Sequence, residues 1–235
     1  MQDSATVEIT TRFLAKILQQ APEGTVVIGG FAVQALVANE FNLSTGQQYP
    51  FPPDISLFVP AERMRMMQSA LESLEVWKGA MPFRYTAVVD RDNLVTLSED
   101  EAVQFPLHQL VYVDVNLFSD PEAPGAFHLP GTRKELRTRS LPVPFRGAAA
   151  AIPEPTLLLS MKCKAYVERE GEDRAVKDAC DIMALVAYGA AVPGPGEREI
   201  LKRLLAGGDE SDLLAAELVG GKEALARLKR AAANP

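Results

Sequence analysis

The segment Thr25-Val26-Val27-Ile28-Gly29-Gly30-Phe31 gives the first indication of how this chain folds. Its first four residues are all β-branched, and they predict a short buried strand rather than a helix. After the two glycines, helical character resumes at residues 31–39. A strand that delivers two glycines to the start of a helix lets backbone N–H groups approach a phosphate closely. A tight turn without a ligand gives the same pattern and is the commoner case, so later motifs have to decide.

A second short strand is predicted at residues 54–59, and it begins with an acidic residue, Asp54. Because strand side chains alternate, residues 54 and 56 point to the same face. Two carboxylates at these positions would bind a divalent cation through hard oxygen ligands, but the second position is Ser56. A further strand, at residues 110–118, carries Asp114 among apolar neighbours. An unpaired buried charge is costly, so Asp114 is expected to have a partner or a metal.

The second half of the chain is expected to be helical. Lys162 lies inside an apolar helical run, where its ammonium would meet a phosphate or a carboxylate rather than bulk water. A snorkelling lysine, or an ion pair with Asp178 or Asp181, explains Lys162 equally well. Asp178 and Asp181 are three positions apart and therefore share a helical face.

The order of the predicted elements indicates an α/β (α+β) protein with a mixed sheet flanked by helices and a helical C-terminal part. We expect an α/β core at residues 1–150 and a helical region at residues 151–235. The other elements expected in the core are helices at 7–18 and 61–74, a loop at 42–53, strands at 85–89 and 94–97, and a hairpin arm at 136–145. The helices expected afterwards are at 155–170, 174–188, 197–206, 209–218 and 221–231.

Composition narrows the classes of function. The chain has 235 residues, 47% of them apolar, and a formal net charge of −7, which disfavours broad electrostatic binding to nucleic acid or anionic membranes. No apolar run approaches the roughly 20 residues of a membrane span, and the polar start, Met1-Gln2-Asp3-Ser4, is unlike a signal peptide. Cys163 and Cys180 match neither a metal spacing nor a disulfide framework, so a reduced, cytoplasmic protein is expected.

Two further charge patterns are present in the sequence. A local basic cluster on the predicted hairpin arm could line a groove for nucleic acid or a triphosphate, although a solvated strand edge is the commoner explanation. This cluster consists of Arg133, Lys134, Arg137, Arg139 and Arg146. Asp90 and Asp92 could replace the missing acid at position 56, but they flank a predicted turn, and turn chemistry accounts for them.

Taken in order, these motifs resemble the nucleotidyltransferase superfamily, and most closely the branch that includes the AbiEii-type toxin proteins. That branch combines a Gly-Gly turn, an Asp-x-Asp strand, a later strand aspartate, a lysine-bearing helix and a Lys-Asp-x-x-Asp helix. The matching positions in this chain are Gly29-Gly30, Asp54 to Ser56, Asp114, Lys162, and Lys177-Asp178 to Asp181. The resemblance runs over about residues 25–188, and the order and spacing of its short motifs give it weight.

The resemblance implies a nucleotidyltransferase-like mixed sheet and a site for a nucleoside triphosphate. Gly29, Gly30, Ser56 and Lys162 would contact the nucleotide, and Asp54 and Asp114 would bind Mg²⁺. Asp178 would orient or deprotonate an acceptor hydroxyl on RNA, a protein or a small molecule. The reaction would release pyrophosphate after in-line attack on the α-phosphorus.

Two departures keep further functions open. Residues 50–53 read Pro-Phe-Pro-Pro where relatives often carry Arg and Thr, and Ser56 supplies no negative charge to offset Mg²⁺. An active transferase, a catalytically impaired nucleotide-binding relative, and an interaction protein with an antitoxin-like partner therefore all remain as alternatives. The sequence specifies neither the nucleotide nor the acceptor.

Overall fold

The computed structural model describes residues 4–79, 81, 83–119, 127–128, 133–169, 173–207, 220 and 222–233. By their internal contacts the residues fall into two compact units. The first unit comprises Met1–Phe31 and Phe51–Ile152, and the second comprises Ala32–Pro50 and Pro153–Pro235. The contacts thus group residues 32–50 with the helical C-terminal unit, while the division into domains at residue 150 stays a prediction. Each unit is described separately below.

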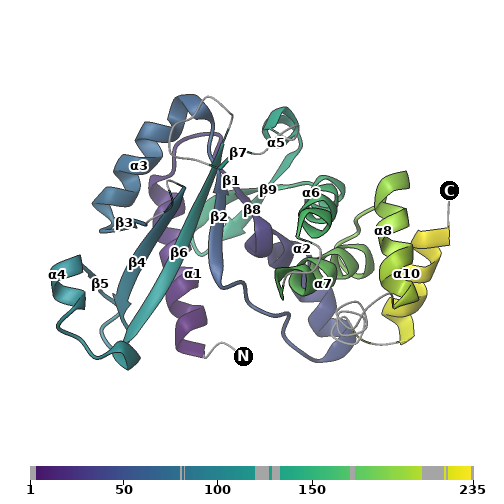
Figure 1. Ribbon diagram of the computed structural model, residues 1–235, viewed down its shortest axis with the longest axis horizontal. Helices are drawn as coiled ribbons and strands as arrows, with labels where there is room; N and C mark the ends of the chain where they lie inside the picture. The colour runs from purple at the N-terminus through teal and green to yellow at the C-terminus, as the bar shows by residue number, and fades with distance from the viewer. Residues whose placement is uncertain are drawn as a thin grey trace. The chain divides into compact units, whose positions relative to one another are not determined.

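The first unit is built on a mixed sheet (Figure 1). Its strands follow the order β1-β2-β6-β4-β3, while β5 pairs with β4 and β7 pairs with β6. These strands are β1 (Val26–Ile28), β2 (Asp54–Phe58), β3 (Trp77–Lys78), β4 (Arg84–Asp90), β5 (Thr96–Leu97), β6 (Leu110–Ser119) and β7 (Phe127–His128). β2 runs parallel to β6, whereas β1 is antiparallel to β2 and β4 is antiparallel to β6. The expected mixed sheet is confirmed.

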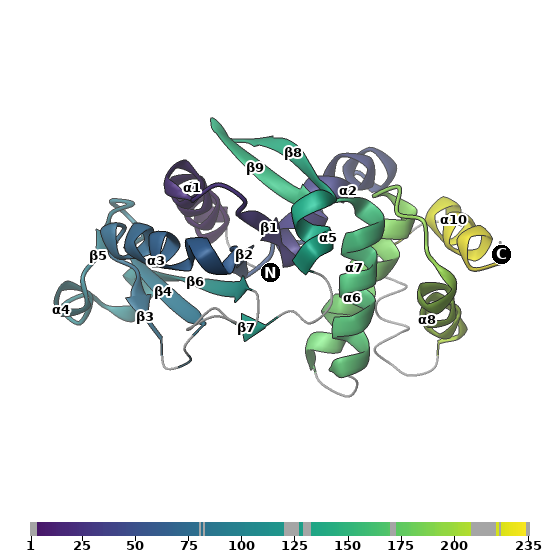
Figure 2. The ribbon, with the colours of Figure 1, turned by 90° about the horizontal axis from the view of Figure 1, so that it is seen from above.

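The two faces of the central strands differ in chemistry. Ile55 and Leu57 of β2 and Val113 and Val115 of β6 are fully buried and form the apolar face. Helix α1 (Ser4–Gln20) packs on β2 and β6 and against helix α3 (Met64–Ser73), and both helices lie on one side of the sheet (Figures 1 and 2). A short 3₁₀ turn, η1 (Ala61–Arg63), precedes α3, and helix α4 (Glu99–Ala102) and a second turn, η2 (Leu107–Gln109), lie between β5 and β6. The opposite face carries Asp54 and Ser56 of β2 and Asp114 and Asn116 of β6, and it is called the polar face below.

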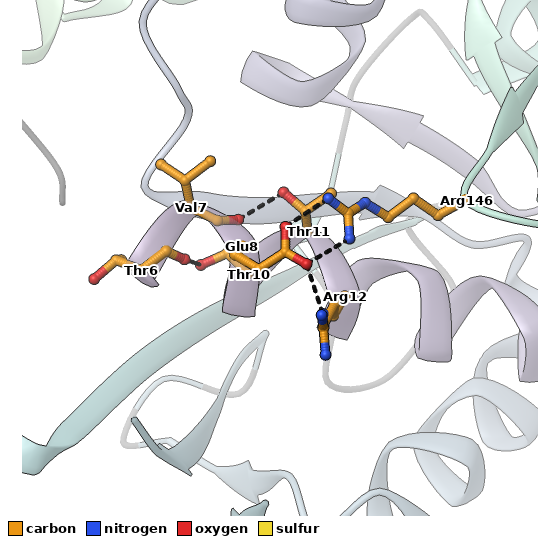
Figure 3. A network of polar contacts seen from close by, with 7 residues as sticks. All are labelled: Thr6, Val7, Glu8, Thr10, Thr11, Arg12 and Arg146. Carbon is orange, nitrogen blue, oxygen red and sulfur yellow. Dashed lines mark hydrogen bonds and ion pairs between the residues drawn. The ribbon is translucent and has the colours of Figure 1, made fainter. Parts of the chain in front are cut away.

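A polar network on the surface of α1 connects this helix to a turn that is distant in sequence (Figure 3). The guanidinium of Arg146 donates to both carboxylate oxygens of Glu8, at 2.8 and 2.6 Å, and Arg12 donates to Glu8 from one helical turn away. The hydrogen bonds from Arg146 and Arg12 lower the pKa of Glu8 to about 2. Glu8 therefore remains ionised at any ordinary pH.

The arm expected at residues 136–145 is only partly a hairpin. Residues 133–138 form helix α5 (Arg133–Thr138), whose Leu136 is fully buried. The hairpin is formed by β8 (Ser140–Phe145) and β9 (Ala148–Pro153). The prediction of strand at residues 136–138 was wrong. These residues end helix α5, which buries Leu136, and the hairpin starts only at Ser140. Lys134 and Arg137 lie on helix α5, and Arg146 lies in the turn of the hairpin. These three residues therefore do not form the alternating row along a hairpin that was the less common of the two explanations.

The second unit consists of helices. These are the part of α2 (Gly29–Thr45) that follows residue 31, together with α6 (Pro155–Glu168), α7 (Asp173–Ala187), α8 (Pro195–Ala206) and α10 (Lys222–Ala233). The ring of Phe41 lies 5.3 Å from the rings of both Tyr49 and Tyr188 in edge-on contacts, which ties α2 and the following loop to α7. The expected helical C-terminal part is confirmed, and the helix expected at residues 209–218 lies outside the described residues.

Some element boundaries differ from those expected. Helix α2 starts at Gly29 itself and ends at Thr45, so it takes in the first residues of the loop expected at 42–53. Strands β3 and β9 were not predicted, since Trp77–Lys78 is only two residues long and 148–153 is rich in alanine. No helix among the described residues has the length and apolar character needed to cross a bilayer.

Candidate functional site

The candidate site lies on the polar face of the sheet in the first unit. Asp54 of β2 and Asp114 of β6 are register partners on adjacent parallel strands, and Ser56 and Asn116 form a second such pair. Neighbouring strands lie about 4.8 Å apart, and paired side chains point to the same face. Two carboxylates from segments far apart in sequence are therefore neighbours, as the resemblance implied.

Asp54 is held by two donors. The side-chain amide of Asn116 donates to Oδ2 of Asp54 at 2.8 Å, and the hydroxyl of Ser56 donates to the same oxygen at 3.3 Å. Arg84 Nε in turn donates to Oδ1 of Asn116 at 3.3 Å, which fixes the amide with its NH₂ group toward Asp54. Ser56 and Asn116 are buried, so they hold the half-buried Asp54 carboxylate in one orientation.

Asp114 has a different partner. The hydroxyl of Thr86 donates to Oδ1 of Asp114 at 2.8 Å, and Thr86 is the register partner of Asp114 on β4. Among the described residues, hydrogen bonds reach only Oδ2 of Asp54 and only Oδ1 of Asp114. Each carboxylate thus keeps one oxygen without a protein donor among those residues. Like charges at paired strand positions repel each other, and a bound cation would remove that repulsion.

Gly29 stands directly beside Ser56. It adopts a left-handed backbone conformation, with φ of 67°, at the junction of β1 and α2. A Cβ atom at this position would lie 3.2 Å from Cβ and 3.3 Å from Oγ of Ser56, closer than ordinary van der Waals contact. Both the backbone conformation and the close approach therefore require glycine, and the N-terminus of α2 begins next to Ser56.

An alanine in the left-handed conformation costs roughly 1–2 kcal/mol, and Gly29→Ala is expected to lower the free energy of unfolding by more than this amount. The additional loss comes from the contact with Ser56. Gly46→Ala is a matched control, because Gly46 has a φ of 69° just after the other end of the same helix and no atom within 4 Å of its Cβ position. Urea denaturation measures both variants, and equal losses would contradict a tight contact between Gly29 and Ser56.

The donor set suits magnesium. Mg²⁺ is commonly bound by one or two carboxylates together with waters and substrate phosphates, rather than by an all-protein cage. The two carboxylates Asp54 and Asp114 match that pattern. Among the described residues there is no group of three or more His, Cys, Asp or Glu side chains placed to hold a metal ion.

The residues predicted on helices form a separate network in the second unit. Lys162 of α6 is buried, and its Nζ lies 2.9 Å from Oδ1 of Asp178 and 2.6 Å from Oδ2 of Asp181. Arg169 donates to the other oxygen of Asp178 at 2.9 Å, and the hydroxyl of Tyr49 donates to Asp181 at 2.7 Å. Of a phosphate contact, a snorkelling side chain and an ion pair, which the sequence left open for Lys162, the structure shows the ion pair, and it does so with both aspartates.

The electrostatics of this network keep Lys162 charged. Burial alone would lower the pKa of Lys162, but the charges and hydrogen bonds of Asp181 and Asp178 outweigh it and hold that pKa above its usual value. Burial, together with the charge of Asp181, also raises the pKa of Tyr49, so its hydroxyl remains a donor. The network is therefore a set of satisfied charges inside the helical unit.

Other candidates are placed away from the carboxylate pair. Asp90 ends β4, four residues beyond Thr86, and accepts hydrogen bonds from the backbone N–H groups of Asp92 and Asn93 and from the Asn93 side chain. It is a turn residue, as the turn chemistry indicated. Cys163 and Cys180 are free, and burial raises the pKa of each to about 12, so neither thiol is an activated nucleophile.

Three site residues escaped the sequence analysis: Arg84, Thr86 and Asn116. Alternation along β6 could have found Asn116, because it stands two positions after Asp114 and so shares its face. Arg84 and Thr86 depend on the pairing of β4 with β6, which no local pattern reveals.

Fold and site together define the class of this protein: a mixed α/β unit with paired carboxylates on adjacent parallel strands, continued by a helical unit. No family model matches the chain, and no curated protein matches it. It is similar to two solved structures at low identity.

The first is an antigenic nucleotidyltransferase-like protein from Paracoccidioides brasiliensis, with 17% identity, a TM-score of 0.49, and coverage of 94% of this chain and 92% of the other. The second is ANT(2")-Ia in complex with adenylyl-2"-tobramycin, with 13% identity, a TM-score of 0.44, and coverage of 88% and 95%. With TM-scores below 0.5, the two structures are reported as similar to this chain, and no role is assigned to the chain from them.

Proposed function

We propose that this chain is a Mg²⁺-dependent nucleotidyltransferase whose metal and triphosphate are bound by the first unit. One observation carries the proposal: Asp54 and Asp114 occupy paired positions on adjacent parallel strands, each with one carboxylate oxygen that no described residue hydrogen-bonds. The amide of Asn116 and the hydroxyl of Thr86 each hold one oxygen of these carboxylates, and the other oxygen of each would bind the cation. A Mg²⁺ ion held by two carboxylates usually completes its coordination with oxygen atoms of phosphate groups and water.

The Gly29 turn supplies the second part of the proposed site. The N-terminus of α2 begins at Gly29, beside Ser56, and Gly30 follows without a side chain. Helix N-termini attract anions through free N–H groups and the helix dipole. The β- and γ-phosphates would lie at this end, and the α-phosphate would contact the Mg²⁺ that Asp54 and Asp114 hold.

The proposed reaction transfers a nucleotidyl group to a hydroxyl. The acceptor oxygen attacks the α-phosphorus and forms a new P–O bond, while the bond from that phosphorus to the bridging oxygen breaks and pyrophosphate leaves. The hydroxyl proton passes to water. Mg²⁺ would stabilise the charge on the phosphate oxygens, and Asp54 and Asp114 would hold it in place.

Lys162 and Asp178 have a different role in this proposal from the one that the resemblance implied. Each is already engaged by an opposite charge, Lys162 with both aspartates and Asp178 with Lys162 and Arg169. We assign them to the stability of the helical unit rather than to contacts with the triphosphate or the acceptor.

Calorimetric titration with the four ribonucleoside triphosphates, with and without Mg²⁺, tests the proposal. Binding is expected to require Mg²⁺ and to weaken at least about tenfold in Asp54→Ala, since even outer-shell partners of a bound metal contribute that much. Asp92→Ala is the control, because Asp92 is an exposed acid of the same unit outside the site. Absence of Mg²⁺-dependent binding for every triphosphate would contradict the proposal.

A second function is favoured by Ser56. The hydroxyl of Ser56 donates to Asp54 at the position where a second carboxylate would bind the metal more strongly. Because Ser56 adds no negative charge, the chain would bind a nucleotide without transferring it. Pyrophosphate release distinguishes the two functions. Mg²⁺-dependent binding without pyrophosphate release, for any triphosphate and any hydroxyl acceptor offered, would favour the nucleotide-binding protein.

A further inference from the structure

A pocket of about 700 Å³ opens on the polar face of the first unit, beyond Asp114. Its lining is contributed by β3, β4, β6 and the start of α4, and consists of Trp77, Lys78, Gly79, Thr86, Glu99, Tyr112 and Asp114. The volume is in the range of pockets that hold small molecules. Thr86 and Asp114 belong to the site already described, whereas the aromatic and charged residues of the pocket have no role in it.

The register of the sheet puts the pocket on a definite side of the carboxylate pair. One row of paired residues crosses the sheet as Asp54, Asp114, Thr86 and Trp77 on β2, β6, β4 and β3. Gly29 lies beside Ser56 at the β1 end of this face, and the pocket lies at the β3 end. Asp54 and Asp114 are therefore between the turn proposed to hold the terminal phosphates and the pocket.

The order of Gly29 turn, carboxylate pair and pocket agrees with the geometry of an in-line displacement. The attacking hydroxyl and the departing pyrophosphate occupy opposite sides of the α-phosphorus. If pyrophosphate leaves toward Gly29, the acceptor must approach from the side of the pocket.

The lining indicates what kind of molecule would fit. Tyr112 stands two residues before Asp114 on the same strand face, and 51% of its surface is exposed, so its ring is accessible to a ligand in the pocket. Trp77 packs against the small apolar cluster of Val88, Leu97, Ala102 and Leu110, which holds its ring beside the pocket. Aromatic faces of this kind stack on flat rings, and Lys78 and Glu99 supply a donor and an acceptor at the edge.

We propose that this pocket is the acceptor site and that it binds a hydroxyl-bearing molecule with a flat ring, of nucleoside size. The ring stacks on Tyr112, and a hydroxyl of the same molecule reaches the α-phosphate beside Asp114. The assignment as acceptor site rests on the proposed function, while the binding of the ring does not.

The chain contains a single tryptophan, Trp77, which makes the test specific to this pocket. Fluorescence excited at the tryptophan band is followed while adenosine, guanosine, cytidine and uridine are titrated in the absence of metal and phosphate. At least one nucleoside is expected to change the emission saturably. Tyr112→Ala is expected to weaken that binding roughly fivefold to a hundredfold, and Tyr112→Phe to retain it. Leu107→Ala, at an exposed position of the same unit, is the control.

A second arm identifies the role of the pocket. The α,β-methylene analogues of ATP and GTP, with Mg²⁺, are added to the protein loaded with nucleoside. An acceptor site predicts simultaneous binding, so the nucleoside affinity should change less than about twofold. Displacement of the nucleoside would overturn the acceptor assignment, because the pocket would then hold the base of the triphosphate.

The remaining outcomes separate this inference from the proposed function. No saturable change of Trp77 emission with any nucleoside, or a change that Tyr112→Ala leaves intact, overturns the pocket as a ring site even where Mg²⁺-dependent triphosphate binding is found. Conversely, nucleoside binding that needs Tyr112 in a protein that binds no Mg²⁺-triphosphate supports the ring site and contradicts the transferase.

Discussion

Replacing Lys162 with Met is expected to lower the free energy of unfolding of the protein by about 3–5 kcal/mol. Lys162 neutralises both Asp178 and Asp181, each only 2% exposed, and Met matches its length but not its charge. The variant would leave Asp181 with only the Tyr49 hydroxyl and Asp178 with only Arg169 among the partners given by the described residues. Urea denaturation followed by far-UV circular dichroism measures the change.

The matched control for this variant is Lys177→Met. Lys177 lies on α7, directly before Asp178, but its side chain is exposed, so the expected change is below about 0.5 kcal/mol. Arg169→Met should fall between the two, because the Arg169 side chain is 40% exposed and solvent screens its ion pair. A loss in Lys162→Met no larger than that in Lys177→Met would show that the buried network does not hold the helical unit together.

Ser56→Asp is expected to have the second-largest effect on stability, and the sign of this effect depends on whether Mg²⁺ is present. Without metal, a third carboxylate on the same strand face as Asp54 adds repulsion of about 1–4 kcal/mol for like charges about 4 Å apart, so the melting temperature falls. With Mg²⁺ the same carboxylate becomes an additional ligand, and binding to the folded state alone restores stability by mass action. The rise in melting temperature on adding Mg²⁺ should therefore be larger in the variant than in the natural chain.

Ser56→Asn separates charge from shape in this experiment. Asn occupies nearly the same volume as Asp beside Gly29 but carries no charge, so it should show any steric loss without the stronger response to Mg²⁺. If Mg²⁺ raises the melting temperature of Ser56→Asp no more than that of Ser56→Asn, the proposal that Asp54 and Asp114 hold a metal is contradicted.

Local sequence patterns were enough to predict many of the strands and helices of this protein. The β-branched run before Gly29 predicted β1, and the two glycines predicted the turn into α2, because backbone conformation follows from side-chain branching and from the absence of Cβ. Strand alternation placed Asp54 with Ser56 on one face, which the register with β6 bears out. The four late helices within the described residues, α6, α7, α8 and α10, were predicted with boundaries within a few residues, since the helical stripe is a property of the chain itself.

Tertiary structure alone decided which of these residues meet. The pairing of β2 with β6 brings Asp114 beside Asp54, and the pairing of β4 with β6 adds Thr86 and Arg84. Strand pairing depends on contacts between distant segments, so periodicity within one strand cannot reveal it. For the same reason the partners of Lys162 stayed open in the sequence, where a phosphate and a carboxylate were equally good counterions. The packing of α6 against α7 decided for Asp178 and Asp181, because burial leaves no charge there without a neighbour of opposite sign.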